Sequence, residues 1–494
     1  MTKKIAIISS DIIDSKMAGV GIRYWEIANS LSQKFEVILL CPIGSKINSE
    51  KIRIIEFDYK NQNIKELVEN VSVIIISGFT LHFHPYLKDL NIPLAVDLYV
   101  PFMLESLIWH KNDELERWIP DFEEFLRVQN ELLRAGDFFF CANERQRDFW
   151  IGMLLANKRI NPHQILQDES LDKLIKIVPY GIRMPITQQK SAKNVYAKYG
   201  IPDKAKIIIW SGGVWDWLDP ITLINAFENL QEKNDNVVLF FMGAEHPNNL
   251  DIKMSLTSQC KALSSEIGLL NKKIFFGDWI PYNDRWNYLQ SADLCVLTFR
   301  NHIETRLSNR TRLIDCLGVN LPVVITMGDF VGEELAKEGL AEIVPPEDQI
   351  ALTKALSKML DIDRNFLSEK FLHFAKKYHW DISVQPLVEF CQDAKVAIDK
   401  GKYLTEVERI SKDKDNFLYK VITEKDEFLQ KVIIDKDEFL EKVVEEKEIQ
   451  FDVKTSELRS EITNQKLLIE KYQRNIFYRI YRKLKKFVGR DHYE

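Results

Sequence analysis

The chain has 494 residues, of which 46% are hydrophobic and 28% are charged, and its formal net charge is −6. This is the composition of a globular protein, which excludes wholesale disorder, a collagen and a disulfide scaffold. A net negative charge gives no general case for a nucleic-acid partner. The six cysteines are scattered without a C-x-x-C pair, so we expect reduced core residues of a cytoplasmic protein.

The N-terminus has no long apolar region followed by a cleavage site, so export is not expected. No apolar stretch reaches the roughly 18 residues that a spanning helix needs, so we expect none to cross a membrane.

In the first part of the chain, short β-branched runs alternate with helical patterns. We expect a helix around 23–33, and strands at 5–9, 37–41, 73–77, 94–98 and 138–142. Uninterrupted apolar strands separated by helices predict a parallel sheet that helices cover on both faces. Residues 1–185 are therefore assigned to a Rossmann-like domain.

A second series of the same kind follows, with strands expected at 206–211, 237–243, 273–277, 294–298 and 322–326. Residues 186–400 form the second Rossmann-like domain and end in a return helix, and the segment 178–181 predicts the hinge. Doubly wound sheets bind ligands at the carboxyl ends of their strands, so two facing domains predict a cleft.

The tail after residue 400 carries an internal repeat. Residues 414–422 recur at 425–433 and 436–444, with a period of 11, and residues 402–488 contain no Gly or Pro. Eleven residues over three turns predict a straight or slightly right-handed coiled coil, which we assign to 401–470. Its strand number, and whether its partner is a second copy or another protein, stay open.

The last segment, 471–494, is assigned to a basic amphipathic helix. It carries 8 Lys and Arg against 2 Asp and Glu, whereas 401–470 carries 13 against 18. Aromatic and aliphatic residues at helical spacing opposite a basic face favour an anionic membrane surface, contacted through 474–490. The alternative is the basic end of the coiled coil.

Several runs in residues 1–395 resemble the retaining GT-B glycosyltransferases of the family-4 type, which act on nucleotide sugars. The runs are 18–23, 96–99, 141–150, 178–181, 210–217, 275–279 and 304–315. The resemblance implies an α/β fold of two Rossmann-like domains, with the acceptor mainly on the first and the donor mainly on the second.

Gly212 and Gly213 follow the first strand of the second domain, where backbone can approach a donor. The family's Arg and Lys in this loop align with Gly213 and Leu218, so the usual pyrophosphate ligands are missing there. Transfer still requires cations at the pyrophosphate, because charge develops on that leaving group. Three arginines within seven residues, Arg306, Arg310 and Arg312, are the candidates to replace them.

The family's E-x7-E motif is also altered. Its second acid falls on Asp315 and its first on Leu307. We assign Asp315 to the donor ribose and Glu304 to the donor sugar, as a catalytic residue. Asp278 and Trp279 follow a strand where the family holds the base.

On the acceptor side, Asp97 ends a strand and is assigned as the second catalytic residue, to orient or deprotonate the acceptor hydroxyl. Residues of the acceptor and phosphate loops are Gly19, Gly21, Arg23, Glu144 and Arg145, although turns and structural ion pairs explain them equally well. No metal site or cofactor is expected, since His82 and His84 lack a further ligand at suitable spacing.

The leading interpretation is a metal-independent glycosyltransferase of the hexosyltransferase type. It would act at the inner face of the cell membrane on a lipid-linked or polysaccharide acceptor, in bacterial surface glycan synthesis. A catalytically lapsed scaffold for other transferases is the alternative, and a nucleotide-sugar epimerase ranks third.

Overall fold

The computed structural model describes residues 2–183, 195–232, 234–244, 256–400, 417–434 and 451–487, together with Lys414 and Lys436. The chain divides into two compact units, Met1–Lys400 and Gly401–Glu494.

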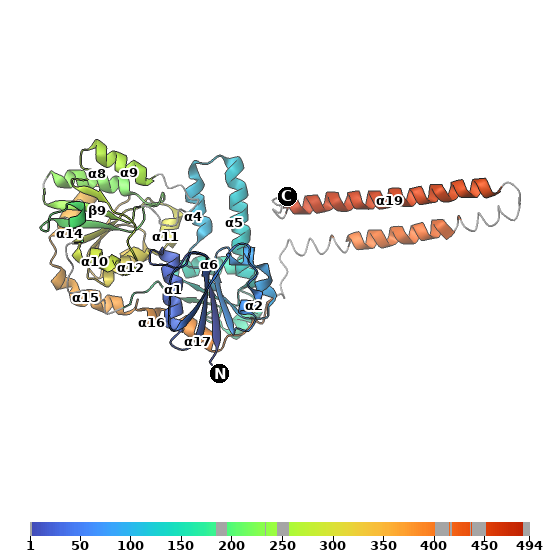
Figure 1. The fold of residues 1–494 in the computed structure, drawn as a ribbon, viewed down its shortest axis with the longest axis horizontal. Helices are drawn as coiled ribbons and strands as arrows, with labels where there is room; N and C mark the ends of the chain where they lie inside the picture. The colour runs from blue at the N-terminus through green and yellow to red at the C-terminus, as the bar shows by residue number, and fades with distance from the viewer. Residues whose placement is uncertain are drawn as a thin grey trace. The chain divides into compact units, whose positions relative to one another are not determined.

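The first unit contains two fully parallel sheets, which confirms the predicted pair of Rossmann-like domains (Figure 1). The first sheet has the strand order β3-β2-β1-β4-β5-β6-β7. Its strands are β1 Lys4–Ile8, β2 Glu36–Pro42, β3 Ile52–Phe57, β4 Val73–Ser77, β5 Leu94–Asp97, β6 Phe138–Cys141 and β7 Ile175–Ile177. Strand order reverses between β1 and β4, which is where a doubly wound sheet opens a ligand crevice.

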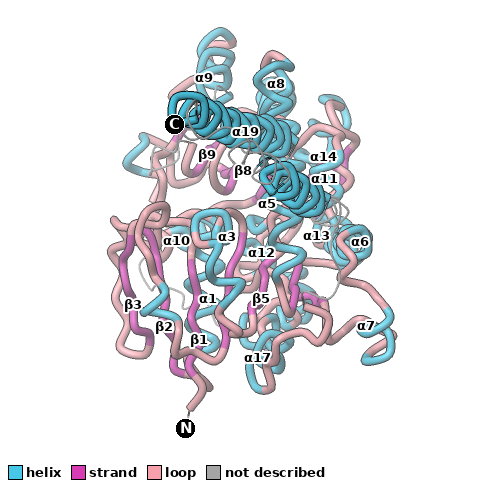
Figure 2. The backbone as a smooth tube through the Cα atoms, turned by 90° about the vertical axis from the view of Figure 1, so that its right-hand side faces the viewer, coloured by secondary structure: helices cyan, strands magenta, loops and turns pink. Residues whose placement is uncertain are grey.

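The second sheet has the order β10-β9-β8-β11-β12-β13 and reverses between β8 and β11. Its strands are β8 Lys206–Ser211, β9 Val237–Met242, β10 Ile274–Phe276, β11 Leu294–Leu297, β12 Val323–Thr326 and β13 Ala341–Val344. Figure 2 shows the labelled strands of the two sheets as two separate groups with helices around them.

Helices follow most strands, as the crossover connections of a parallel sheet require. The first domain has α1 Gly19–Leu31, α2 Lys65–Val68, α3 Thr80–Phe83, η1 Pro85–Asp89, α4 Phe102–Trp109, η2 His110–Asn112, α5 Leu115–Ala135, α6 Glu144–Ala156 and α7 Pro162–Gln167. The second has η3 Ala197–Tyr199, α8 Pro220–Gln231, α9 Leu256–Glu266, α10 Arg285–Ser291, α11 Ile303–Leu307, α12 Thr311–Leu317, α13 Phe330–Lys337, α14 Gln349–Leu360 and α15 Arg364–Lys376.

Local sequence explains where several of these helices begin. The side chains of Asn143, Asp219 and Asp329 each accept a hydrogen bond from a backbone N–H in the first turn of α6, α8 and α13. Such caps satisfy donors that the helix itself leaves unpaired. The central strands are runs of Ile, Val, Leu and Phe that are buried on both faces, and the six cysteines are free and buried, as expected.

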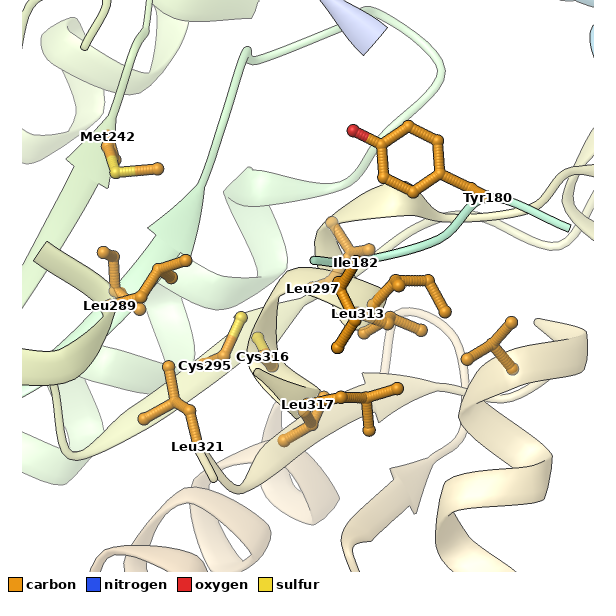
Figure 3. Packing of buried hydrophobic residues seen from close by; sticks show 14 of the residues in the cluster. Tyr180, Ile182, Met242, Leu289, Cys295, Leu297, Leu313, Cys316, Leu317 and Leu321 are labelled. Atoms are coloured by element: carbon orange, nitrogen blue, oxygen red, sulfur yellow. The ribbon is translucent and has the colours of Figure 1, made fainter. Parts of the chain in front are cut away.

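The chain crosses between the two domains twice, and the two crossing segments are hydrogen-bonded to each other. Ile182 forms a parallel bridge with His379, and its N–H donates to the carbonyl of Tyr378 at 2.8 Å. Ile182 lies beside Leu297 and Leu313 of the second domain (Figure 3), inside one apolar cluster that extends into both domains. The predicted hinge at 178–181 is thus packed against the return crossing.

After the second crossing, the chain returns to the first domain as α16 Trp380–Ser383 and α17 Gln385–Gln392. The return ends at Asp399, whose buried carboxylate accepts hydrogen bonds from Arg159, Asn161 and Gln164 of the first domain. The last residues of the first unit are therefore fixed to the first domain.

In the second unit, residues 417–434 are helical and α19 spans Phe451–Phe487. Phe417 and Phe428, which occupy equivalent places in successive repeats, are 66% and 67% exposed. The helices agree with the sequence pattern, but they do not show a coiled coil. Most of the third repeat and residues 488–494 lie outside the described part of the chain.

Candidate functional site

The loop after β8 is built from two glycines at the point where the second sheet reverses. Gly212 has a φ of +106°, which a residue with a side chain rarely adopts. A Cβ at this position would also lie 3.0 Å from Nε of Arg312. Both observations explain glycine here, because the loop must turn sharply and leave room for the arginine.

Arg312, on α12, lies against this glycine loop. Its Nη2 donates to the carbonyl of Gly213 at 2.5 Å, and the guanidinium lies 5.6 Å from the centre of the Trp210 ring. Nη1 is buried and has no hydrogen-bond partner, and no carboxylate pairs with Arg312 within the described ranges. Burial, followed by repulsion from Arg310, lowers the pKa of Arg312 to about 9, so the side chain is still charged at neutral pH.

The other two arginines of the cluster have different environments. Arg310 donates to the carboxylate of Glu304 at 2.8 Å, and Glu304 is fully buried. The second oxygen of Glu304, Oε1, is buried and accepts no hydrogen bond. Arg306 is exposed. Of the three candidates, Arg312 is therefore the one that combines closeness to the loop with an unneutralised charge.

Asp315, one turn further along α12, forms a bidentate ion pair with Arg285. Nε and Nη2 of Arg285 donate to the two carboxylate oxygens, each at 3.1 Å. Arg285 was not among the residues that the sequence singled out, because nothing near it in the chain marks a partner thirty residues away.

Aromatic side chains cover the ends of β8 and β9. Trp279 approaches Gly243, with its Cε3 atom 3.3 Å from the position of an added Cβ, while the neighbouring Asp278 is exposed. Trp215 and Trp217 stack in parallel with their ring centres 5.4 Å apart. This pair was not predicted as part of the site, although two tryptophans directly after a glycine loop are a signal.

On the acceptor side, Asp97 is buried and paired. Arg23 donates to both of its oxygens, at 2.6 and 3.1 Å, and a second bond of Nη2 reaches the carbonyl of Val178 at 2.9 Å. The N–H of Tyr99 donates to the same carboxylate. Arg23 and Asp97 thus connect the first domain to the hinge, and the carboxylate that we expected to face an acceptor is occupied by these partners.

The two glycines in the first turn of α1 have different surroundings. A Cβ on Gly21 would lie 2.8 Å from the carbonyl oxygen of Ile12, so packing alone requires glycine there. The nearest atom to a Cβ on Gly19 is Oγ1 of Thr311, at 4.0 Å. The first residue of α1 therefore approaches the start of α12, next to Arg312.

The first turn of α6 holds the two domains together. Nε2 of Gln146 donates to the carbonyl of Leu307 at 2.6 Å, and Arg145 bonds the carbonyl of Gly328 and the carboxylate of Glu333. Glu144, which we grouped with Arg145, is exposed. Gln146 was missed, since an interior glutamine carries no sequence signal of a contact 161 residues away.

Two further acids belong to this region. Glu105 on α4 has its pKa raised to about 7, mainly by burial and then by the charge of Glu304, against the opposing effect of Arg310. Asp329, which is fully buried at the start of α13, has its pKa raised to about 6 by burial. Neither acid was expected from the sequence.

Two parallel Rossmann-like sheets in one compact unit, the second with a glycine loop after its first strand, have the architecture of a GT-B glycosyltransferase. Residues 205–361 match the family model described as glycosyl transferases group 1. The predicted resemblance is thereby confirmed, and the chain has the GT-B fold of the group 1 glycosyltransferases. No curated protein matches the chain at a significant level.

Solved structures share the fold over 79% of this chain. WaaG, a glycosyltransferase involved in lipopolysaccharide biosynthesis, is 15% identical with a TM-score of 0.56 and covers 79% of this chain and 100% of its own. A glycosyltransferase from Rickettsia africae is 16% identical, with 79% and 98% covered and a TM-score of 0.55. Alr3699/HepE of Anabaena, solved with UDP-glucose, is 12% identical, with 79% and 99% covered and a TM-score of 0.57.

Within the described ranges, no group of three or more His, Cys, Asp or Glu side chains is placed to hold a metal ion. In the same ranges, no helix has both the length and the apolar character needed to cross a bilayer.

Proposed function

We propose that the protein transfers a hexose, with retention, from a nucleoside-diphosphate sugar to a lipid-linked or polysaccharide acceptor in bacterial surface glycan synthesis. The observation that carries this proposal is Arg312, a charged guanidinium beside the Gly212–Gly213 loop that no carboxylate among the described residues neutralises. A buried cation without a counter-ion is costly, and an anionic ligand would remove that cost.

The donor diphosphate lies, in this proposal, between Arg312 and the backbone of Gly212, Gly213 and Gly19. Arg312 stabilises the charge that develops on the departing diphosphate, and so replaces the arginine that the family carries in the loop. Asp315 contacts the ribose and Glu304 the sugar, while Trp279 and Asp278 border the base. Arg310 takes part by holding Glu304, and Arg306 lies outside the site.

The acceptor hydroxyl enters from the first domain. Arg23, Asp97 and Gly21 are positioning residues here, because their contacts hold the hinge and the loop before α1. Arg145 keeps the two domains in contact, and Glu144 at the exposed start of α6 is available to a glycan chain.

Two of the similar structures support the substrate class. WaaG acts in lipopolysaccharide biosynthesis and Alr3699/HepE was solved with UDP-glucose, so UDP is the first nucleotide to test. The tail supplies the place of action: a basic helix at 474–490 docks on the anionic inner face of the membrane, where lipid-linked acceptors are concentrated. Its repeat region joins a second copy or a partner protein.

The test is calorimetric titration of the purified protein with UDP, GDP, dTDP, ADP and CMP. The Arg312→Gln variant should bind the preferred nucleotide about 10-fold to 100-fold more weakly, since hydrogen bonds to charged groups contribute about 1.5–3 kcal/mol. Arg306→Gln, which removes the same charge from an exposed position, is the matched control and should bind as the wild type does.

Absence of binding to all five nucleotides would reject the donor site. The alternative, a lapsed enzyme that scaffolds other transferases, would then gain support. It is favoured by one observation, since Leu307, which is 8% exposed, occupies the place of the family's first acid.

A further inference from the structure

We propose that Arg285 is a positioning residue, which holds the Asp315 carboxylate ready for a ribose diol and links it to the acceptor-side domain through Tyr282 and Glu26. This inference rests on the proposed function, because it assumes a nucleotide at Asp315.

The first step is the geometry of the ion pair. Arg285 donates one hydrogen bond to each oxygen of Asp315, both at 3.1 Å. Each carboxylate oxygen has two lone pairs, so one acceptor position per oxygen stays open. A pair of neighbouring hydroxyls, as on a ribose, matches two such positions. The Asp315 side chain is 11% exposed, so it keeps a surface that a ligand can reach.

The second step is the rigidity of Arg285. Its guanidinium lies 3.7 Å from the ring centre of Tyr282 and 4.0 Å from that of Trp286. Nη1 donates to the carbonyl of Tyr282 at 2.5 Å. With both ring contacts and all three nitrogens engaged, the plane of the guanidinium is fixed, and it fixes the plane of the carboxylate in turn.

The third step connects this pair to the other domain. The hydroxyl of Tyr282 donates to Oε1 of Glu26 at 2.8 Å. The backbone N–H of Tyr282 donates to the carbonyl of Ser15 at 2.6 Å. Glu26 is 3% exposed, lies on α1, and also pairs with Arg183 at the hinge. Separation of the two domains must break both contacts of Tyr282 with the first domain, and these contacts hold the residue on which Arg285 packs.

A matched control exists in the same domain. Arg364, at the start of α15, donates to the carbonyls of Asn320, Val319 and Ala292. It has no carboxylate partner within the described residues. It lies on α15, whereas Arg285 and Asp315 lie on α10 and α12. Arg364 holds loops together. A substitution of Arg364 therefore shows how nucleotide binding changes when an arginine with only a structural role is lost.

The first experiment compares the preferred nucleoside diphosphate with its 2′-deoxy form by calorimetry, starting with UDP. The wild type should prefer the ribonucleotide by about tenfold, the effect of one lost hydrogen bond to a charged group. Asp315→Asn and Arg285→Lys should both bring this ratio close to one. Arg364→Lys should keep the wild-type ratio even if it lowers stability, because a general structural loss weakens both ligands equally.

The inference is overturned if Arg285→Lys keeps the wild-type ratio, or if the wild type does not distinguish the two forms. A wild type that binds no nucleotide would instead reject the proposed function, and the inference with it.

The link to α1 has its own variant. Tyr282→Phe removes only the hydroxyl that reaches Glu26. In hydrogen–deuterium exchange, UDP should slow exchange in both α1 and α12 of the wild type, but only in α12 of Tyr282→Phe. Equal slowing of α1 in both proteins would show that Tyr282 does not couple the domains.

Discussion

The rings of Phe138 and Phe390 stack with their centres 4.5 Å apart and their planes within 9° of parallel. Phe138 begins β6 of the first domain, and Phe390 belongs to α17, some 250 residues later. The final helix of the first unit therefore completes the core of the first domain, although the second domain lies between them in the sequence.

This stack predicts that Phe390→Ala lowers the free energy of unfolding by about 2–4 kcal/mol, because it removes a packed ring and an aromatic pair. Urea denaturation measures the change. Phe366→Ala, at a position that is 80% exposed, should change it by less than about 0.5 kcal/mol. An equal effect of the two substitutions would contradict the importance of the stack.

A second prediction concerns the hinge. A Cβ on Gly181 would lie 2.8 Å from both Cδ2 of Trp380 and the carbonyl of Tyr378, so Gly181→Ala should destabilise the protein by about 1–3 kcal/mol. Gly152, inside α6, has no atom within 4 Å of its added Cβ, and Gly152→Ala should stabilise it by up to about 1 kcal/mol. Thermal unfolding of the two variants should therefore shift in opposite directions.

The Glu304–Arg310 pair separates stability from activity. Glu304→Leu and Arg310→Met each leave a buried charge unpaired and should cost about 3–5 kcal/mol, whereas the double variant should recover most of this loss. Activity should stay absent in the double variant, since the group proposed to contact the sugar is gone. Urea denaturation and turnover of the preferred nucleotide sugar give the two readings, and an active double variant would exclude Glu304 from catalysis.

The fourth prediction is a pH dependence at Glu105. Its pKa is about 7 in the folded protein against an ordinary 4.5, so the folded state binds more protons between these values. Stability must then fall as pH rises through this window, and Glu105→Gln should remove that fall. Because the side chain is partly accessible, we expect the variant to gain about 1–2 kcal/mol at pH 8 and nothing at pH 5.

Denaturation at the two pH values measures this difference. Glu123→Gln, at an exposed position of α5, is the control: it should change the free energy of unfolding equally at pH 5 and at pH 8. A Glu105→Gln variant with the wild-type pH profile would show that the carboxyl is not shifted.

The sequence predicts the centres of both sheets well and their edges poorly. Central strands such as β8 are continuous apolar runs, because helices cover both faces. The strands that the pattern did not reveal, β3, β7 and β13, all lie at sheet edges and carry polar or half-exposed residues. The 21-residue helix α5, with Pro120 inside it, was also not anticipated.

In the site, the sequence locates the glycine loop and the arginine cluster but cannot rank the arginines. One continuous helix would place Arg306 and Arg310 on the same face, four residues apart. Instead, α11 ends at Leu307 and α12 begins at Thr311, and this break separates exposed Arg306 from half-buried Arg310. Partners such as Arg285 and Gln146 depend on tertiary packing, which no local pattern encodes.

Hydrogen bonds from Arg159, Asn161 and Gln164 fix Asp399 to the first domain. They therefore determine which of the two domains is attached to the tail. The tail begins two residues later, so it is joined directly to the first Rossmann-like domain. If the tail is held at a surface, the first domain is held with it. Any change in the angle between the two domains then becomes a movement of the second domain alone.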